Sequence, residues 1–389
     1  MRNHPAIVPA VGCVALCALS VAAGRAQQAP PAQPTFRAGV SYVELPVRVT
    51  DRQGNFIRGL QPTDFELYED GSRQQIAAFS LVDVPPPDPK RPVIEPASGA
   101  AAKPFILHEG DAVEGRVYLF VLDDFHILPQ YSYRVKSIVQ SFVRQRMGPQ
   151  DLAAVVYTSV TRGSDFTQDR RQLISSLDRF MGGLDTLEPG DTLNLKSIAA
   201  LDKIRSMVDT LGKIKGRHKA LLFISPTLGC YTQKQALAEF ADSLAPDTPA
   251  SRCYNTLQES VRKATQANVS IYSFDPTNIG NPGWVSPSID GRGGPGAALQ
   301  RARAADGNPV SVFDGMRVLA EETGGFTVTN VNNFDKALDR IVREHSSYYL
   351  IGYYPTNDRA DGRVRRNAIA LNRTDVQVVY RPTYTAPKQ

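Results

Sequence analysis

The sequence predicts an α/β fold, in which a doubly wound, mostly parallel sheet is joined to a second, smaller β module built from the N- and C-terminal segments. Three observations predict it. Residues 115–345 alternate apolar runs with stretches of helical periodicity, the order typical of a parallel sheet covered by helices. The apolar runs are continuous, as in strands buried on both faces. Residues 36–84 and 346–389 contain strand-like runs with no helices between them.

Length and composition place the chain among ordinary globular proteins. Its 389 residues suggest two or three domains and are enough to bury a sizeable core. Hydrophobic residues make up 42% and charged residues 21% of the chain, and the formal net charge is +5. The basic residues are scattered and are not interleaved with aromatic residues in a patch, which argues against nucleic acid as a partner.

The first 26 residues have the pattern of an export signal. Arg2 and His4 precede a short apolar stretch, and the run Gly24-Arg25-Ala26 follows with small residues on both sides of the arginine. We expect cleavage after Ala26, with a retained membrane anchor as the alternative. Residues 27–35 are Pro-rich and predict a disordered tether. No later run is long enough to span a bilayer. The mature protein is therefore expected to be exported to the periplasm, the cell envelope or the medium.

Cysteine usage fits an oxidising compartment. Cys13 and Cys17 lie inside the export segment, so the mature chain keeps the pair Cys230 and Cys253. An even pair in an exported protein predicts one disulfide bond between them. Two separate thiols are the alternative, because sequence does not show the distance between the two Cα atoms. A metal site is less favoured, since no histidine lies near either cysteine.

The N-terminal β unit is predicted at residues 36–84. Apolar residues alternate with polar or small ones from 43 to 49, which is typical of a half-buried strand. Turns at 51–54 and 69–71 separate it from two further strand-like runs. Proline and small residues dominate 85–114, which we interpret as a linker or a long loop.

The α/β domain is predicted at residues 115–345. Its strands are expected at 117–122, 152–158, 218–225, 269–275 and 326–330, and its helices at 131–147, 169–180, 193–211, 254–268, 312–325 and 333–345. Residues 276–309, rich in Gly, Pro and Asn, predict a long irregular loop, a feature uncommon in compact domains unless it has a function. The strand-like runs after residue 346 are expected to pair with residues 36–84 in a sandwich-like module.

Candidate chemistry is concentrated after the first strand of the α/β domain. Asp123 and Asp124 end this strand, at the edge where open α/β sheets bind ligands, and His126 follows. A hydrolytic site using these three residues is conceivable. The sequence places no nucleophile by motif, however, since Ser225 is not in a Gly-x-Ser-x-Gly elbow, and the glycine-rich run at 291–296 lacks the context of a phosphate loop. We therefore do not expect an enzyme.

Six segments run in order from about residue 40 to residue 384: VELPVRVTDRQGNFIRGLQPTDFELYEDG, VYLFVLDDFH, HKALLFISPTLG, NVSIYSFDPTNIG, LAEETGGFT and YYLIGYYP. In these segments the chain resembles a von Willebrand factor type A domain. More closely, it resembles the exported VWFA-related proteins abundant in Acidobacteria. The resemblance implies a central, mostly parallel sheet with flanking helices.

The resemblance also implies where a metal-ion-dependent adhesion site would lie. In such a site an Asp-x-Ser-x-Ser run, a Thr and a later Asp bind Mg²⁺. An acidic side chain of the partner protein completes the coordination of the ion. Asp123 matches the first Asp, and Thr192 is the best match to the Thr. Phe125 and Ile127 stand at the two Ser positions, and Pro226 stands where the last Asp is expected. Asp124 is an additional carboxylate.

These differences from the adhesion-site pattern determine how strongly the chain is expected to bind a metal ion. With Asp123, Asp124 and Thr192 as the candidate ligands, no cofactor is certain and the site is degenerate, suited at most to weak binding of Mg²⁺ or another divalent cation. The alternative is that both aspartates cap the next helix or bind water at the sheet edge.

The function expected from these observations is an exported, non-enzymatic module that binds a protein or a cell-surface polymer through the edge at which the strands end. Phe125 and His126 are its expected contact residues. Two alternatives stay open, an exported hydrolase using Asp123, Asp124 and His126, and a structural envelope component in which this edge is vestigial.

Overall fold

The structure is a computed structural model that describes residues 42–84, 86–87, 115–159, 164–183, 191–214, 216–230, 249–277 and 314–387. The predicted export signal, the tether, most of the Pro-rich linker and the loop at 278–309 lie outside the described residues. Residues 36–389 form one compact unit. None of the described helices combines the length and the apolar character needed to cross a membrane.

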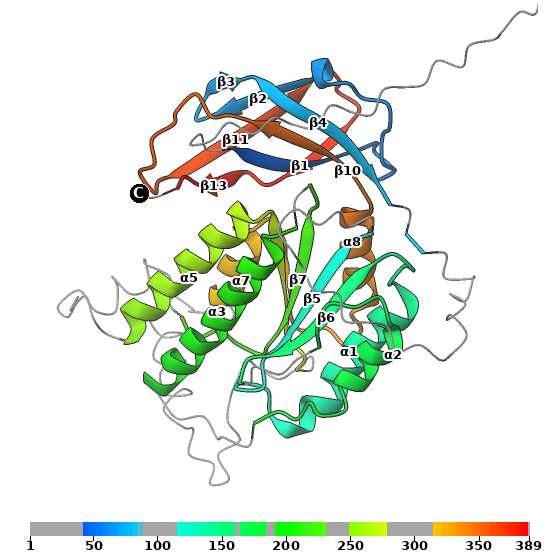
Figure 1. Cartoon of the computed structure of the whole chain (residues 1–389), viewed down its shortest axis with the longest axis vertical. Helices are drawn as coiled ribbons and strands as arrows, with labels where there is room; N and C mark the ends of the chain where they lie inside the picture. The colour runs from blue at the N-terminus through cyan, green and yellow to red at the C-terminus, as the bar shows by residue number, and fades with distance from the viewer. Residues whose placement is uncertain are drawn as a thin grey trace, which may run out of the picture. The chain divides into compact units, whose positions relative to one another are not determined.

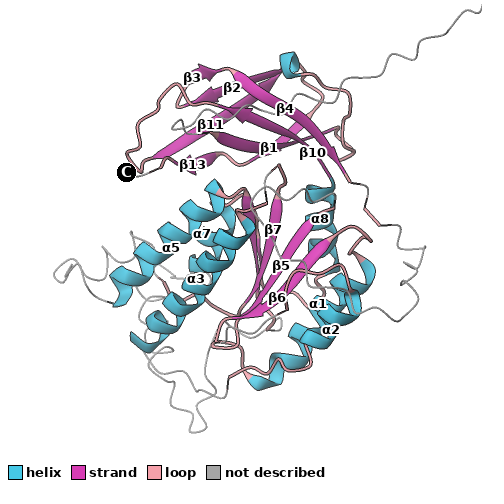
Figure 2. Cartoon of the chain, viewed as in Figure 1, coloured by secondary structure: helices cyan, strands magenta, loops and turns pink. Residues whose placement is uncertain are grey.

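The centre of the α/β domain is a parallel sheet of five strands within the described residues, in the order β6-β5-β7-β8-β9. Figures 1 and 2 show helices on both of its faces. The strands are β5 (Val117–Leu122), β6 (Leu152–Tyr157), β7 (Lys219–Ile224), β8 (Val269–Phe274) and β9 (Thr327–Val328). The helices are α1 (Ser132–Gln145), α2 (Arg170–Ser176), α3 (Asp191–Leu211), α5 (Pro249–Gln266), α7 (Asp314–Glu321) and α8 (Asp335–Ser346).

The apolar runs form these strands because both of their faces are covered. Alternate residues of β5 point to opposite faces. Val117, Leu119 and Val121 pack with α3, α5 and α7, whereas Tyr118 and Phe120 pack with α1, α2 and α8. Every residue of β5, β6, β7 and β8 is buried. The predicted doubly wound parallel sheet is confirmed.

The second module is a β sandwich made from both ends of the chain. One sheet has the order β12-β1-β10-β4 and the other the order β13-β11-β2-β3. Its strands are β1 (Val43–Thr50), β2 (Phe65–Glu69), β3 (Ser72–Gln74), β4 (Ile76–Asp83), β10 (Ser347–Tyr353), β11 (Val364–Leu371), β12 (Gln377–Tyr380) and β13 (Thr383–Thr385). Strand β10 pairs with β1 and with β4, both antiparallel. The predicted pairing of the two chain ends is confirmed.

The α/β domain is inserted between two neighbouring strands of the sandwich. Helix α8 ends at Ser346, and β10 begins at Ser347 with no intervening loop. On the other side of the insertion, the backbone N–H of Val84, just after β4, donates to the carbonyl of Ser346 at 2.7 Å. The two chain connections between the parts therefore lie side by side.

A buried ion pair holds the start of the sheet. The Arg116 guanidinium donates to both carboxylate oxygens of Asp151, with its Nη2 at 2.7 Å from Oδ2, and its Nη1 donates to Ser346 Oγ at 3.0 Å. Asp151 also accepts from the backbone N–H of Arg116 and of Gly148. Both side chains are almost fully buried, at 2% and 1% exposure. The pair thus joins the starts of β5 and β6 to the end of α8.

The predicted disulfide between Cys230 and Cys253 is present in the structure, with a Cα–Cα distance of 5.2 Å. It ties the segment after β7 to helix α5, in the same apolar cluster as Leu257 and Met316.

Replacing both cysteines with serine is expected to lower the free energy of unfolding by about 3 kcal/mol, the loop-closure value for a separation of 23 residues. Denaturant unfolding with and without reductant measures this loss. Reductant should shift the wild-type midpoint and leave that of the double variant unchanged. Two alkylatable thiols in the unreduced protein would contradict the bond.

Candidate functional site

Polar side chains gather at the carboxyl ends of the parallel strands. Asp123, Asp124 and His126 follow β5, Thr158 and Ser159 follow β6, Ser225 follows β7, and Asp275 follows β8. We call this set, together with Phe125, the rim. Parallel strands end at the same edge of a sheet, so residues far apart in the chain meet here. Arg116 at the start of β5 contacts Ser346 beside the sandwich, so the rim lies at the opposite end of β5.

Asp123 is the centre of the rim and is fully buried, at 0% exposure. Its Oδ2 accepts from Ser225 Oγ at 2.6 Å and lies 2.6 Å from His126 Nδ1. Its Oδ1 accepts from Thr158 Oγ at 3.0 Å. The backbone N–H of Ile127 donates to the Asp123 carbonyl at 3.0 Å, and this turn brings His126 back over the carboxylate. An ionised carboxylate only accepts, so the tautomer that fits has its proton on Nδ1.

Asp124 is half-buried and is held from the side of β6. Its Oδ1 accepts from Thr158 Oγ at 2.8 Å and from the backbone N–H of Ser159 at 2.9 Å, and its Oδ2 accepts from Ser159 Oγ. A threonine hydroxyl carries one proton. Thr158 therefore shares that proton between the carboxylates of Asp123 and Asp124, which keeps the two acidic groups beside each other.

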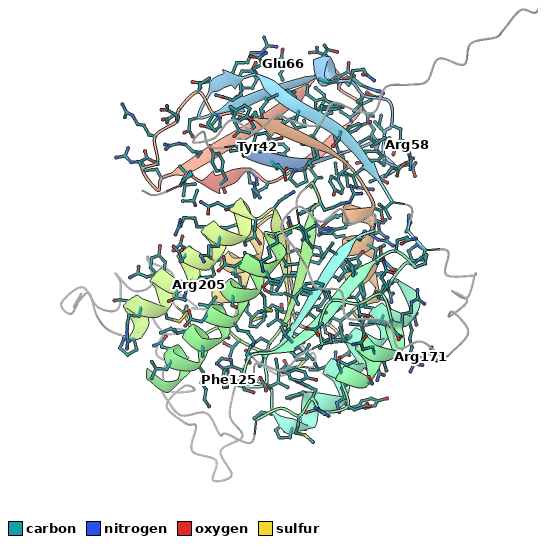
Figure 3. All side chains as sticks on the ribbon, in the orientation of Figure 1. Tyr42, Arg58, Glu66, Phe125, Arg171 and Arg205 are labelled. Carbon is teal, nitrogen blue, oxygen red and sulfur yellow. A yellow bond between two sulfur atoms is a disulfide. The ribbon has the colours of Figure 1, made fainter. Side chains whose placement is uncertain are left out.

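Two predicted contact residues have different surroundings. Phe125 is partly exposed, and Figure 3 labels it at the end of the α/β domain where the strands terminate. His126 is 2% exposed. Its Nε2 has no hydrogen-bond partner among the described residues. The expectation that His126 touches a partner thus differs from its position in the structure, because the hydrogen bond to Asp123 turns the ring inward.

The rim was only partly predictable: Thr158 and Ser159 were missed, and Ser225 was considered only as a nucleophile. All three donate to the two aspartates, and Thr158 and Ser225 directly follow buried apolar runs, which is a usable signal. Asp275 is a further rim carboxylate that the sequence did not single out. It is 2% exposed, and burial raises its pKa, although hydrogen bonds from the backbone and hydroxyl of Thr277 oppose this rise.

The residues present do not fit a magnesium site of the adhesion type. Both oxygens of Asp123 are already engaged by protein donors. Phe125 and Ile127 carry no oxygen ligand, and Pro226 has none either. Thr192 begins helix α3, but its side chain lies outside the described residues. Within the part of the chain that the structure describes, no group of three acidic, histidine or cysteine side chains is placed to hold a metal ion.

Apolar side chains are exposed beside the rim. Tyr133, in the first turn of α1, is 83% exposed, and Met181 is 64% exposed. Ser132 Oγ contacts Met181 Sδ at 3.7 Å and accepts from the backbone N–H of Gly182 at 2.9 Å, so the segment that carries Met181 packs against the start of α1, where Tyr133 lies. A Cβ at Gly182 would lie 2.2 Å from the Ile127 carbonyl oxygen, so only glycine allows this approach. We call Phe125, Tyr133 and Met181 the rim patch.

Comparisons with known proteins give structural similarities alone. No family model matches the chain, and no curated protein matches it. An aerotolerance-related membrane protein from Bacteroides fragilis is 15% identical over 59% of this chain and 98% of its own, with a TM-score of 0.36. BatB from Bacteroides thetaiotaomicron is 13% identical over 59% of this chain and 97% of its own, with a TM-score of 0.35.

A third solved structure is the vWF domain of the type V pili tip protein Mfa5 from Porphyromonas gingivalis. It is 12% identical to this chain, covers 59% of this chain and 94% of its own, and has a TM-score of 0.34. Similarities at this level do not carry an argument about function.

Proposed function

We propose that this chain is an exported, non-enzymatic binding module, similar to the VWFA-related proteins of Acidobacteria, that contacts a protein through the rim patch. The observation that supports it most is the exposure of Tyr133 and Met181 beside a rim whose polar groups are engaged with one another. Tyrosine and methionine are enriched in protein–protein interfaces, where aromatic side chains commonly carry much of the binding energy. A cell-surface polymer is the alternative partner.

The proposed contact does not depend on a metal ion. A bridging cation would have to displace the hydroxyl and imidazole donors that now hold Asp123, and only Asp124 and the Thr192 side chain would remain as candidate ligands. Mg²⁺ prefers near-octahedral oxygen coordination, and so few protein ligands leave most of its shell to water. The carboxylates instead fix the loops that present the rim patch.

A hydrolase built on Asp123, Asp124 and His126 is the second candidate that the sequence leaves open. The unpartnered His126 Nε2 is the observation in its favour. Against it, the Ser225 hydroxyl shares its proton between Asp123 and the Thr227 carbonyl, and the His126 ring is 2% exposed. Turnover of generic ester, peptide or glycoside substrates that is lost in His126→Ala would support this candidate over the binding module.

Capture of a partner from the organism's own envelope fraction tests the binding proposal. Tyr133→Glu and Met181→Glu are each expected to weaken capture at least tenfold, about 1.4 kcal/mol, because a charge is placed in an apolar contact. Val364→Glu is the matched control, since Val364 is 59% exposed on β11 of the sandwich. Capture should survive chelation of divalent ions.

Two results would contradict this proposal. One is capture that tolerates both rim-patch variants as well as it tolerates Val364→Glu. The other is stoichiometric, micromolar binding of Mg²⁺ or Mn²⁺ in calorimetry that disappears in Asp123→Ala, together with loss of capture on chelation. The second result would replace the rim patch with an intact metal site.

A further inference from the structure

A cavity of about 50 Å³ lies where the sandwich meets the α/β domain, away from the rim. Strands β1 and β12 contribute from the sandwich, and β8, α8 and the end of α7 contribute from the α/β domain. The lining residues are Pro46, Arg48, His218, Ser270, Thr323, Gly324, Glu344, Tyr348, Val379, Tyr380 and Arg381. One water needs roughly 10–15 Å³ of such volume, so this space is larger than a single water site.

Arg381 lines this cavity with a charge that the described residues do not neutralise. It is 5% exposed. Its Nη1 and Nη2 donate to the carbonyls of Thr265 and Glu44, at 2.9 and 3.3 Å, but its Nε finds no acceptor within the described part of the chain. No described carboxylate forms an ion pair with it. Burial lowers its pKa to about 10, although the charge of Glu44 opposes this fall.

Arg48 adds a second guanidinium to the same lining. Its Nη1 donates to the carbonyls of Arg343 and Ser347, at 2.7 and 3.0 Å, and it too forms no ion pair with a described carboxylate. Glu344 also lines the cavity, but its carboxylate is occupied. One oxygen accepts from Arg340 Nε at 2.7 Å and the other from Tyr272 OH at 3.0 Å. The lining therefore has an excess of positive charge.

Neutral polar groups and a glycine complete the lining. His218 Nε2 lies 2.8 Å from Ser270 Oγ, and burial holds the pKa of His218 well below its usual value, so its ring is neutral at pH 7. A Cβ at Gly324, whose φ is +84°, would lie 3.4 Å from Ser270 Oγ and 3.5 Å from Arg381 Cβ. The glycine thus leaves open the space directly beside the arginine.

We propose that this cavity binds a small tetrahedral oxyanion, of the size of phosphate or sulfate, through the guanidinium groups of Arg381 and Arg48. A buried charge is costly unless it is paired. Guanidinium groups match oxyanions in geometry and charge, and each such hydrogen bond is stronger than a neutral one. Because the lining combines sandwich residues, among them Arg48 and Arg381, with residues of the α/β domain, the anion stabilises the contact between the two parts.

Thermal unfolding of the full exported chain tests the proposal. Phosphate and sulfate are compared with chloride at matched ionic strength and pH. At ten times its dissociation constant, the anion should raise the unfolding temperature by about 2–4 °C over chloride. Equal unfolding temperatures in the three salts, at anion concentrations up to 50 mM, would mean that the cavity holds water only and would overturn the proposal.

Substitutions locate the effect at the cavity. Val379, at the cavity lining and 51% exposed, tolerates change without disturbing the core. Val379→Glu should abolish the temperature rise, whereas the matched Val379→Gln should keep it. Arg48→Gln should weaken phosphate binding about tenfold, as should Arg381→Gln if it folds. A rise that persists in Val379→Glu and Arg48→Gln would place the anion elsewhere on the protein and overturn the assignment.

Discussion

A chain that ends at Ser346 is expected to lose the β sandwich while it retains the α/β sheet. Strand β10 is an inner strand, hydrogen-bonded to β1 on one side and to β4 on the other. Its residues Tyr349, Ile351 and Tyr353 form much of the hydrophobic core of the sandwich. Its removal leaves β1 to β4 as an isolated set of short strands, which is marginal in water. The loss is comparable to the whole stability of a domain, about 5–15 kcal/mol.

Limited proteolysis with mass spectrometry measures this effect. Cleavage within residues 43–83 should be rapid in the truncated chain, while the sheet of the α/β domain stays protected. A chain that ends at Pro387 is the control and should behave like the full protein. If residues 43–83 resist protease equally in both chains, the two chain ends do not depend on each other.

The substitution Asp151→Ala is expected to cost about 3–5 kcal/mol, the range for removal of one partner of a buried ion pair. It leaves the Arg116 guanidinium, which is 2% exposed, without its counter-ion. It also leaves the backbone N–H groups of Arg116 and Gly148 without their acceptor. Denaturant unfolding gives the loss directly.

Two controls separate the buried charge from a general effect of substitution. Asp209→Ala removes the ion-pair partner of Lys263. The Asp209 side chain is 58% exposed, so this substitution should lower the free energy of unfolding by less than about 1 kcal/mol. The double variant Arg116→Met/Asp151→Leu should recover much of the stability lost in Asp151→Ala, because it leaves no charge buried. A cost for Asp151→Ala no larger than that for Asp209→Ala would contradict the expectation.

The parallel sheet was predictable because burial on both faces leaves a direct trace in the sequence. The apolar runs at 117–122 and 219–224 are that trace. The helices between the strands were predicted from apolar residues that recur at helical spacing. The pairing of the chain ends was also predictable, since strands without intervening helices do not extend a parallel sheet. The register of Val43 with Tyr353 was not, because it depends on a partner some 300 residues away along the chain.

The details of the rim exceeded what the sequence could supply. Asp123 and Asp124 were identifiable as acids at a strand end. Their donors Thr158 and Ser225 come from neighbouring strands, so finding them required the strand order. The inward turn of His126 depends on hydrogen bonds to Asp123 from its ring and from the backbone of the turn, for which no periodicity exists. Arg48 and Arg381 meet only through the fold of the sandwich.

The insertion of the α/β domain between β4 and β10 has a consequence for the order of folding. Strand β1 is the first described strand to be made, yet its partners β10 and β12 come from the opposite end of the chain. Contacts of such high sequence separation form slowly, since the closure entropy of the whole intervening chain is lost before they stabilise anything. We expect the α/β domain to fold first, with its adjacent ends at Val84 and Ser346 bringing β4 and β10 together. Until then β1 has unpaired edges, which makes the newly made chain vulnerable to aggregation for longest at its N-terminal strands.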